Sequence, residues 1–336
     1  MASRSLPRDA VVVLDARVDM LHPNIRRRIL ERKPSALVAV EAGERSKSFR
    51  VLEQVVAASW AVSRGGTLVA IGGGTVGDVC TVAAHLVKRG VALIHVPTTA
   101  LAAIDSSVGG KGAIHAQHAG RAVKNAAGVF HYPVETWLCQ ELWDTLSLGQ
   151  LREGALEAWK MAACLSAGTW RRYRAHRPSL VQMVREARSL KSAICEEDPY
   201  EQSGERHLLN FGHTFGHVLE SVSRFRLSHG DAVGLGMRCA LDVGRALGVT
   251  PQAVGKEVEE GLDEGAGALS RSVLGHWARR QSAADVAPLL RADKKRASAG
   301  ELRMVLLERL GAARTVNVPS RVWRPLWRRW AQGEAR

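Results

Sequence analysis

Three histidines in the C-terminal half of the chain have the side-chain type and the spacing of a metal site. His213 and His217 are four residues apart, so they share one face if this stretch is helical. His229 follows in what we expect to be the next loop. Two imidazoles one helical turn apart and a third from the following loop could surround a divalent metal. A hydrogen-bonded pair of core histidines is the alternative that this spacing leaves open.

A glycine-rich stretch earlier in the chain indicates a second kind of chemistry. Gly72, Gly74 and Gly77 match the pattern G-x-G-x-x-G, after a predicted strand over 67–71 and before a predicted helix over 79–88. Glycines let the backbone approach a pyrophosphate, and a helix N-terminus favours its charge. The pattern is a weak signal for a dinucleotide site. Asp78 directly follows it and could either contact a nicotinamide ribose or cap the helix.

Isolated charges stand among small residues after the fourth predicted strand. Asp105 and Lys111 frame a run of serines and glycines, and Lys124-Asn125 follows after a turn. We expect both segments to be loops. A surface turn without function is one interpretation, but charges of this kind beside a dinucleotide motif favour substrate binding.

Further along, a predicted helix over 151–166 places Glu153, Glu157 and Lys160 on one face. The commoner structure with this pattern is an exposed, salt-bridged helix face.

The elements that must position these residues change in character near residue 145. Short apolar runs over 10–14, 36–40, 67–71 and 91–96 alternate with helices, as in a parallel sheet covered on both faces. The remainder is predicted to be helical, with the main segments at 151–166, 180–196, 210–223, 231–247, 252–266 and 283–295. We therefore expect an α/β plus all-α protein, with a Rossmann-like domain over 1–145 and a helical metal- and substrate-binding domain over 146–336.

Composition limits the classes of function. The chain has 336 residues, a net charge of +14 and five cysteines without a C-x-x-C motif, which fits reduced cysteines in a cytoplasmic protein. No apolar run approaches the ~20 residues that cross a bilayer, and the N-terminus lacks a signal peptide core. The positive charge is not arranged as a nucleic-acid site in the first 300 residues. The basic segment 319–336 contains three tryptophans and could be an interfacial tail, although we favour a docked C-terminal helix.

Together these motifs make the sequence similar to the 3-dehydroquinate synthase family, within the wider group of sugar phosphate cyclases. The matching stretches occur in family order and are 43–47, 72–78, 88–90, 96–111, 124–133, 157–160, 191, 206–220, 229–230 and 293–295. The resemblance implies a cleft that holds NAD and a divalent metal, with zinc the expected ion and cobalt the alternative. It implies that Glu157, His213 and His229 are the metal ligands. His217 then becomes an acid/base or substrate-contact residue.

The resemblance also implies roles for further residues. The substrate pocket would be lined by Asp105, Lys111, Lys124, Asn125, Lys160, Lys191, Arg206, Asn210 and one of Lys294 or Lys295. The cofactor would be bound by Asp15, Glu44, Lys47, Gly72, Gly73, Gly74, Gly77, Asp78, Thr98, Thr99 and Lys111. Arg89 would reach the substrate phosphate from the partner subunit of a homodimer.

The implied reaction converts 3-deoxy-D-arabino-heptulosonate 7-phosphate to 3-dehydroquinate, with transient oxidation, phosphate elimination and aldol cyclisation. A sister cyclase of the 2-epi-5-epi-valiolone or 2-deoxy-scyllo-inosose synthase type is one alternative, and a metal-dependent alcohol or glycerol phosphate dehydrogenase is another. A catalytically dead scaffold would have lost a ligand or a lysine, and none is lost. The chain departs from the family pattern in three places. At 112–115 the family more often has Thr and then Asn. The other two departures lie at 198–204 and after Lys295.

Overall fold

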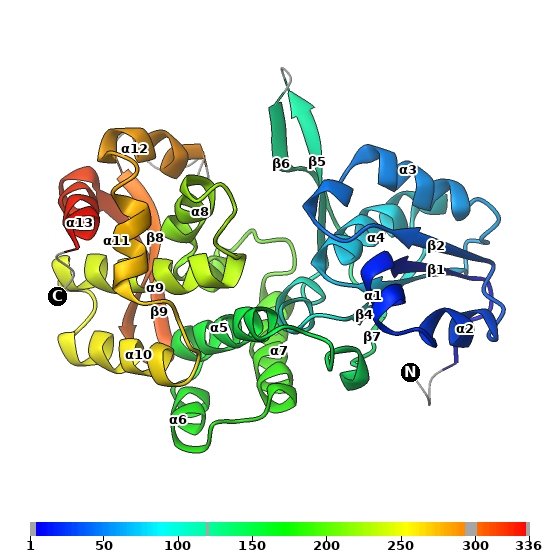
Figure 1. Cartoon of the computed structure of the whole chain (residues 1–336), viewed down its shortest axis with the longest axis horizontal. Helices are drawn as coiled ribbons and strands as arrows, with labels where there is room; N and C mark the ends of the chain where they lie inside the picture. The colour runs from blue at the N-terminus through cyan, green and yellow to red at the C-terminus, as the bar shows by residue number, and fades with distance from the viewer. Residues whose placement is uncertain (1–4, 119–120, 293–300, 334–336) are drawn as a thin grey trace. The chain divides into compact units, whose positions relative to one another are not determined.

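The apolar runs of the N-terminal half form one parallel sheet of five strands, in the order β2-β1-β3-β4-β7 (Figure 1). Its strands are β1 (Ala10–Asp15), β2 (Ala36–Val40), β3 (Thr67–Gly72), β4 (Ala92–Pro97) and β7 (Glu135–Thr136). All four pairings are parallel, and every residue of β1 and β3 is buried. Uninterrupted β-branched runs therefore predict the central strands correctly, because such strands are covered on both faces.

The computed structural model describes residues 5–118, 121–292 and 301–333, and the chain divides into two compact units, Met1–Leu151 and Arg152–Arg336. The first unit adds helices and an antiparallel hairpin to the sheet. They are α1 (Ala16–Leu21), α2 (Ile25–Leu30), η1 (Glu44–Ser46), α3 (Phe49–Ala58), α4 (Gly74–Leu86), η2 (Val87–Arg89), the π-helical η3 (Ala102–Ser106), β5 (Lys111–His118), β6 (Arg121–Phe130) and η4 (Gln140–Leu142).

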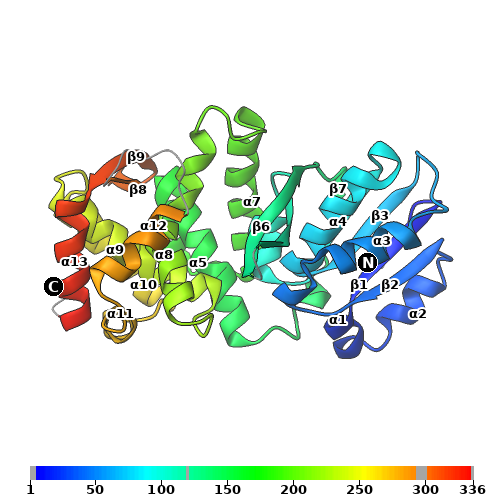
Figure 2. The ribbon, with the colours of Figure 1, turned by 90° about the horizontal axis from the view of Figure 1, so that it is seen from above.

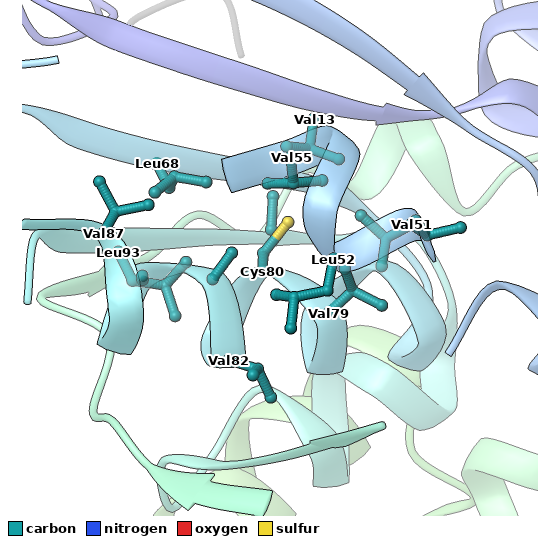
Figure 3. Packing of buried hydrophobic residues seen from close by; sticks show 14 of the residues in the cluster. Val13, Val51, Leu52, Val55, Leu68, Val79, Cys80, Val82, Val87 and Leu93 are labelled. Atoms are coloured by element: carbon teal, nitrogen blue, oxygen red, sulfur yellow. The ribbon is translucent and has the colours of Figure 1, made fainter. Parts of the chain in front are cut away.

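The core of this unit lies between α3, α4 and one face of the sheet. Cys80 of α4 lies among Val13 of β1, Leu68 of β3 and Val55 of α3, and all four are almost fully buried (Figure 3). Burying each of these branched side chains is worth about 1.5–3 kcal/mol. The packing fixes α4, and therefore the glycine-rich turn at its N-terminus, against the carboxyl ends of the central strands.

The loop prediction for Lys111 and for Lys124-Asn125 is wrong. Lys111 begins β5, and Lys124 and Asn125 lie in β6, the second strand of an antiparallel hairpin. Seven of the 18 residues in these two strands are glycine or alanine, and the regular alternation of apolar and polar residues that reveals a strand is missing. The hairpin extends beyond α4 in Figure 1.

The second unit is mainly helical, but it also contains a β-hairpin that the sequence analysis does not anticipate. Figure 2 shows the hairpin of β8 and β9 at an edge of this unit, beside helices α9 and α13. Its elements are α5 (Leu148–Leu165), which begins in the first unit, α6 (Ala167–His176), α7 (Leu180–Glu197), η5 (Glu205–Asn210), α8 (His213–Val222), α9 (His229–Ala246), α10 (Gln252–Glu264), α11 (Arg271–Ala278), α12 (Ala283–Ala292), β8 (Glu301–Arg309), β9 (Ala312–Pro319) and α13 (Ser320–Gln332).

The tryptophan-rich C-terminal segment is a docked helix. In α13, the side chains of Trp323, Trp327 and Trp330 are buried. The indole of Trp330 donates to Asp242 over 2.8 Å, and that of Trp327 donates to the carbonyl of Gln281 over 2.9 Å. The tryptophans are therefore part of the core and do not form an exposed interfacial tail. Among the described residues, no helix is both long enough and apolar enough to cross a bilayer.

All five cysteines are buried and none forms a disulfide, as the composition predicts.

Candidate metal centre and cofactor site

Glu157 and Lys160 lie one turn apart on α5, and each is only 1% exposed. The Lys160 ammonium forms an ion pair with Oε2 of Glu157. The prediction of an exposed salt-bridged face is therefore wrong for these two residues. Two charges in the interior require compensation, because desolvating an ion costs several kcal/mol.

Glycines determine where His213 stands. Gly212 precedes it as the N-cap of α8, with φ of 82°, a left-handed conformation that favours glycine. A Cβ on Gly236 of α9 would lie 2.0 Å from the Gly212 carbonyl oxygen, and a Cβ on Gly216 would lie 3.2 Å from the Ala232 carbonyl oxygen. Main-chain contact therefore holds the N-terminus of α8, with His213, directly against α9.

His229 is the first residue of α9, not a loop residue as predicted. The helix begins two residues earlier than predicted, because the Ser228 hydroxyl caps it by accepting from the Asp231 N–H over 3.2 Å. Gly230 lies so close to α5 that its Cβ would be 2.5 Å from Cα of Glu153. Arg152 of α5 adds two hydrogen bonds of 2.8 Å to the carboxylate of Asp231. These contacts bring His229 next to Glu157.

The structure brings Glu157, His213 and His229 together. Their ligand atoms all lie within 4.8 Å of one another. The Nε2 atoms of His213 and His229 are 3.9 Å and 3.8 Å from Oε1 of Glu157. His217 lies nearby but is not a member of this group: its ring centroid is 5.4 Å from that of His213 and 6.3 Å from that of His229.

The hydrogen bonds around this group suit a metal ion. Nδ1 of His213 lies 3.3 Å from the Phe211 carbonyl oxygen, and Nδ1 of His229 lies 3.4 Å from Oε1 of Glu220. Acceptors at Nδ1 favour the tautomer with the proton on Nδ1, which leaves the Nε2 lone pairs directed at Glu157. Both carboxylate oxygens of Glu157 are buried without a hydrogen-bond donor among the described residues, although Lys160 contacts one of them as an ion pair.

The protonation state of His213 also suits a ligand. Burial, followed by the charges of Lys160, His229 and His217, holds the pKa of His213 well below the ordinary value of 6.5. A metal ligand must be unprotonated. Two imidazoles and one carboxylate are a ligand set of catalytic zinc sites, which keep a fourth position open. The geometry therefore fits a divalent metal with one open position.

The predicted substrate residues of this unit lie on three elements. Lys191 is buried in α7, Arg206 is buried in η5, and Asn210 ends η5. Nη1 of Arg206 donates to the Pro199 carbonyl over 2.9 Å. Lys294 and Lys295 lie outside the described residues.

The loop that departs from the family pattern is organised around Asp198. Its carboxylate accepts the backbone N–H groups of Gln202, Ser203, Gly204 and Arg206, over 2.6–3.4 Å. Burial alone would raise the pKa of Asp198, but the donors from Ser203, Gln202 and Arg206 outweigh it and lower the pKa to about 2. The loop is thus a turn around a fixed anion, and this turn leads directly into Arg206.

In the first unit, the glycine-rich turn joins the end of β3 to the start of α4. Gly73 is the N-cap of α4, with no side-chain cap hydrogen bond. A Cβ on Gly73 would lie 3.3 Å from Cγ2 of Thr99, and a Cβ on Gly74 would lie 3.3 Å from Oγ of Ser106. The turn therefore has little room for side chains, and the first backbone N–H groups of the helix are available to an anion. These features fit the pyrophosphate of a dinucleotide.

Asp78 is not a helix cap, so that alternative is wrong. It lies in the second turn of α4 and forms an ion pair of 2.6 Å with Nζ of Lys47, which is buried. Burial raises the pKa of Asp78 to about 6, with Lys47 lowering it and Glu44 and Asp105 raising it. A carboxylate with this pKa is poised between its two protonation states near neutral pH.

The other predicted residues of the first unit lie on several elements. Asp15 ends β1, and its carboxylate caps α1 by accepting from the Arg17 N–H over 2.8 Å. The Thr98 N–H donates to the Gly72 carbonyl over 3.0 Å. Arg89 has φ of 69°, beside Gly90. The ammonium of Lys111 lies 6.0 Å from the centroid of the Phe130 ring.

Sequence reasoning missed several residues that hold these sites in place. Arg152 and Asp231 connect α5 to α9, Glu220 contacts His229, and His115 connects the hairpin to Glu44 over 3.0 Å. Asp231 stands two residues after a predicted ligand, which is the one local signal. The others are paired across long sequence separations, so only the fold reveals them.

Comparison with known proteins places these observations in a family. The models for the N-terminal and C-terminal parts of 3-dehydroquinate synthase match residues 37–153 and 154–296. The chain is 36% identical over 292 residues to a 3-dehydroquinate synthase of Bradyrhizobium sp., covering 83% of this chain and 75% of the relative. It is 34% identical over 341 residues to that of Rhodopseudomonas palustris strain TIE-1, covering 92% and 88%.

Solved structures agree on the fold. A 2-deoxy-scyllo-inosose synthase matches with a TM-score of 0.79 at 23% identity, covering 98% of this chain and 92% of that one. A 2-epi-5-epi-valiolone synthase from Streptomyces hygroscopicus matches with a TM-score of 0.79 at 23% identity, covering 96% and 91%. An iron-containing alcohol dehydrogenase matches less closely, with a TM-score of 0.56. With both family models matched and identities above one third over most of its length, the chain belongs to the 3-dehydroquinate synthase family.

Proposed function

We propose that this chain converts 3-deoxy-D-arabino-heptulosonate 7-phosphate to 3-dehydroquinate and inorganic phosphate, the step that gives the family its name. It is a phosphate-eliminating lyase that depends on NAD and on a divalent metal. The observation that carries the proposal is the group of Glu157, His213 and His229 in a chain with a glycine-rich dinucleotide turn. Two of the similar solved structures contain NAD⁺ with Co²⁺ or Zn²⁺.

Zinc is the proposed metal, because two imidazoles and a carboxylate with one open position form a set that zinc commonly takes. Nε2 of each histidine and a carboxylate oxygen of Glu157 would hold it. Lys160 balances the charge of Glu157 from the side that faces Oε2.

When bound, NAD would accept a hydride from the substrate and return it, while the metal would hold vicinal hydroxyls and acidify one of them. The N-terminus of α4 would bind the cofactor pyrophosphate, and Asp78 with Glu44 and Lys47 would bind its polar groups. His217 would contact the substrate or move a proton beside the metal ligands.

The charged residues of the second unit support a substrate with a carboxylate. Arg206 and Lys191 are buried cations, and charge-assisted hydrogen bonds from such groups are well suited to a carboxylate. In this proposal they hold the carboxylate together with Asn210, while Lys124, Asn125 and Arg89 hold the phosphate. Fixed donors around both anionic groups position the chain for elimination and ring closure, and such positioning can supply much of a rate enhancement.

An assay with much less NAD⁺ than substrate tests this function. One equivalent of NAD⁺ per chain, with zinc and the heptulosonate phosphate, should support many turnovers with phosphate release and no net NADH absorbance. The product should be identified as 3-dehydroquinate by mass spectrometry. Phosphate release from sedoheptulose 7-phosphate or glucose 6-phosphate in place of the keto acid would assign a sister cyclase. Stoichiometric NADH without phosphate would assign a dehydrogenase.

The proposal includes a cytoplasmic homodimer in which Arg89 of one subunit serves the phosphate site of the other. Sedimentation equilibrium measures the oligomeric state. Mixing an Arg89→Ala chain with a His213→Ala chain should restore activity through hybrid dimers, whereas a monomer would stay inactive in the mixture.

A further inference from the structure

The hairpin of β5 and β6 has an irregularity opposite His115. The register runs from Ile114 paired with Ala127 to Ala116 paired with Val123, so three residues of β6 stand opposite one residue of β5. Asn125 is the central residue of the three and has φ of 51°. A non-glycine residue in the left-handed region is uncommon, so it is held there by its surroundings.

The imidazole of His115 occupies this irregularity. The backbone N–H of Asn125 donates to Nδ1 of His115 over 3.1 Å. On the other side, Nε2 of His115 lies 3.0 Å from Oε2 of Glu44. The backbone N–H of His115 also donates to the Lys47 carbonyl over 2.8 Å. One side chain therefore joins the turn before α3 to the strand that carries Lys124 and Asn125.

These contacts determine the tautomer of the ring. A nitrogen that accepts an N–H must be unprotonated, so Nδ1 is the acceptor and Nε2 carries the proton that it donates to Glu44. Burial lowers the pKa of His115; Glu44 raises it, while Lys47 and Lys124 lower it. These three charged groups face the ring from the turn and from β6. The ring is therefore neutral at pH 7. It accepts a hydrogen bond from the strand, through the Asn125 N–H, and donates one to the turn, through the Glu44 carboxylate.

We infer that His115 is a positioning residue that aligns the substrate-binding pair Lys124 and Asn125 with the cofactor-binding Glu44. This inference rests on the proposed function, since it concerns the same site. The ring touches neither ligand in this account and acts through its two neighbours.

Substitutions can separate the two hydrogen bonds. An Asn side chain places an oxygen near the position of Nδ1 and can accept from Asn125, but it does not reach Glu44. A Gln side chain places its amide near the position of Nε2 and can donate to Glu44, but it leaves the Asn125 N–H without its acceptor. His115→Ala removes both contacts, and a hydrogen bond of this kind corresponds to about two- to tenfold in affinity.

The experiment measures KM for the heptulosonate phosphate by phosphate release, and Kd for NAD⁺ by calorimetry, in the zinc-loaded chain. His115→Ala should raise both constants about two- to tenfold. His115→Asn should restore KM while Kd stays raised, and His115→Gln should restore Kd while KM stays raised. His22→Asn, the same change at a histidine of the first unit outside this site, should alter neither constant.

A purely structural role would move both constants together in all three His115 variants, along with the melting temperature, and would overturn the inference. So would an unchanged KM and Kd in His115→Ala. Imidazole nitrogen NMR of the wild-type chain without ligands should show a protonated Nε2 and an unprotonated Nδ1 at His115; the opposite tautomer would refute the bridge. This readout and the Kd comparison still test His115 if the wild-type chain releases no phosphate, which is the outcome that refutes the proposed function.

Discussion

Glu157 and Lys160, one helical turn apart on α5, form an ion pair that is almost completely buried. The pair places a cation beside the carboxylate that also faces two imidazoles. Lys160 therefore neutralises Glu157 when no metal is bound. A bound metal ion would share the Glu157 carboxylate with Lys160.

The first prediction concerns this shared charge. In the metal-free protein, Lys160→Met should lower the free energy of unfolding by about 3–5 kcal/mol, because a buried carboxylate loses the ammonium that pairs with it. With zinc bound, the loss should be smaller, since the ion compensates Glu157. Urea unfolding with EDTA and with zinc measures both values. The double variant Glu157→Gln/Lys160→Met, which leaves no net charge, should recover part of the loss; equal losses with and without zinc would contradict this account.

The second prediction separates ligands from neighbours. His213→Ala and His229→Ala should each abolish zinc retention after dialysis, because two remaining ligands rarely hold zinc against buffer. His217→Ala, a matched change one turn from His213, should retain about one zinc per chain and lose activity. Elemental analysis of the dialysed proteins measures the zinc that each variant retains. Zinc loss in His217→Ala, or retention in His213→Ala, would reassign the ligands.

The third prediction concerns the substrate carboxylate. Arg206→Ala should weaken binding of the heptulosonate phosphate at least tenfold, since a charge-assisted hydrogen bond contributes about 1.5–3 kcal/mol. Binding of sedoheptulose 7-phosphate, which lacks the carboxylate, should change much less. Arg206→Lys keeps the charge and serves as the control for local packing. Equal losses for both ligands would mean that Arg206 does not bind the carboxylate.

A fourth prediction follows from the pKa of Asp78. The ionised carboxylate accepts hydrogen bonds from NAD⁺ more strongly than the neutral acid does, so affinity should fall as the pH decreases through about 6. The fold should not be weakened by this group: a pKa raised from 3.8 to about 6 means that protonation of Asp78 favours the folded state over that interval. Calorimetric titrations of NAD⁺ at several pH values test this. Asp78→Asn should bind weakly with a flat profile over that range, and a wild-type affinity independent of pH would refute the role.

The fifth prediction concerns the docked C-terminal helix. Asp242 accepts hydrogen bonds from Arg271 at 2.7 and 2.9 Å, from Arg245 at 3.2 Å and from the indole of Trp330 at 2.8 Å. Asp242→Ala should lower the free energy of unfolding by about 3–5 kcal/mol, because Arg271 and Arg245 lose a largely buried anionic partner. It should also expose the tryptophan side chains of α13 to solvent, which a shift in tryptophan fluorescence would detect. Glu264→Ala breaks an exposed pair with Arg174 and should cost about 1 kcal/mol or less. Similar losses in both variants would show that α13 docks without help from Asp242.

The sequence is informative wherever a local pattern determines the structure. The buried strands are uninterrupted β-branched runs, and the turn before α4 must be glycine-rich, so both are predicted from a few neighbouring residues. The hairpin strand that carries Lys124 and Asn125 was not predicted, because glycine and alanine give no alternation to detect. The burial of Glu157 and Lys160 was not predicted either, since charges three residues apart look the same on an exposed helix and on a buried one.

The metal site could be predicted from the sequence only in part. The histidines and Glu157 can be selected from the sequence through the resemblance to a family. Their distances depend on how α5, α8 and α9 pack, and this packing rests on contacts such as the one between Arg152 and Asp231, which are 79 residues apart. Pairings over such separations carry no local pattern.

The contact between Gly212 and Gly236 has a mechanical consequence for the metal site. Main-chain atoms at the start of α8 touch α9 at Gly236, two turns into that helix, so no side chain lies between them there to adjust their spacing by a change of rotamer. The position of His213 relative to α9 is therefore set by backbone contact. A metal bound by His213 and His229 would find little freedom to move these ligands apart, so the site would penalise a larger ion such as Ca²⁺, whose ligands stand at 2.3–2.6 Å, relative to an ion of the size of Zn²⁺.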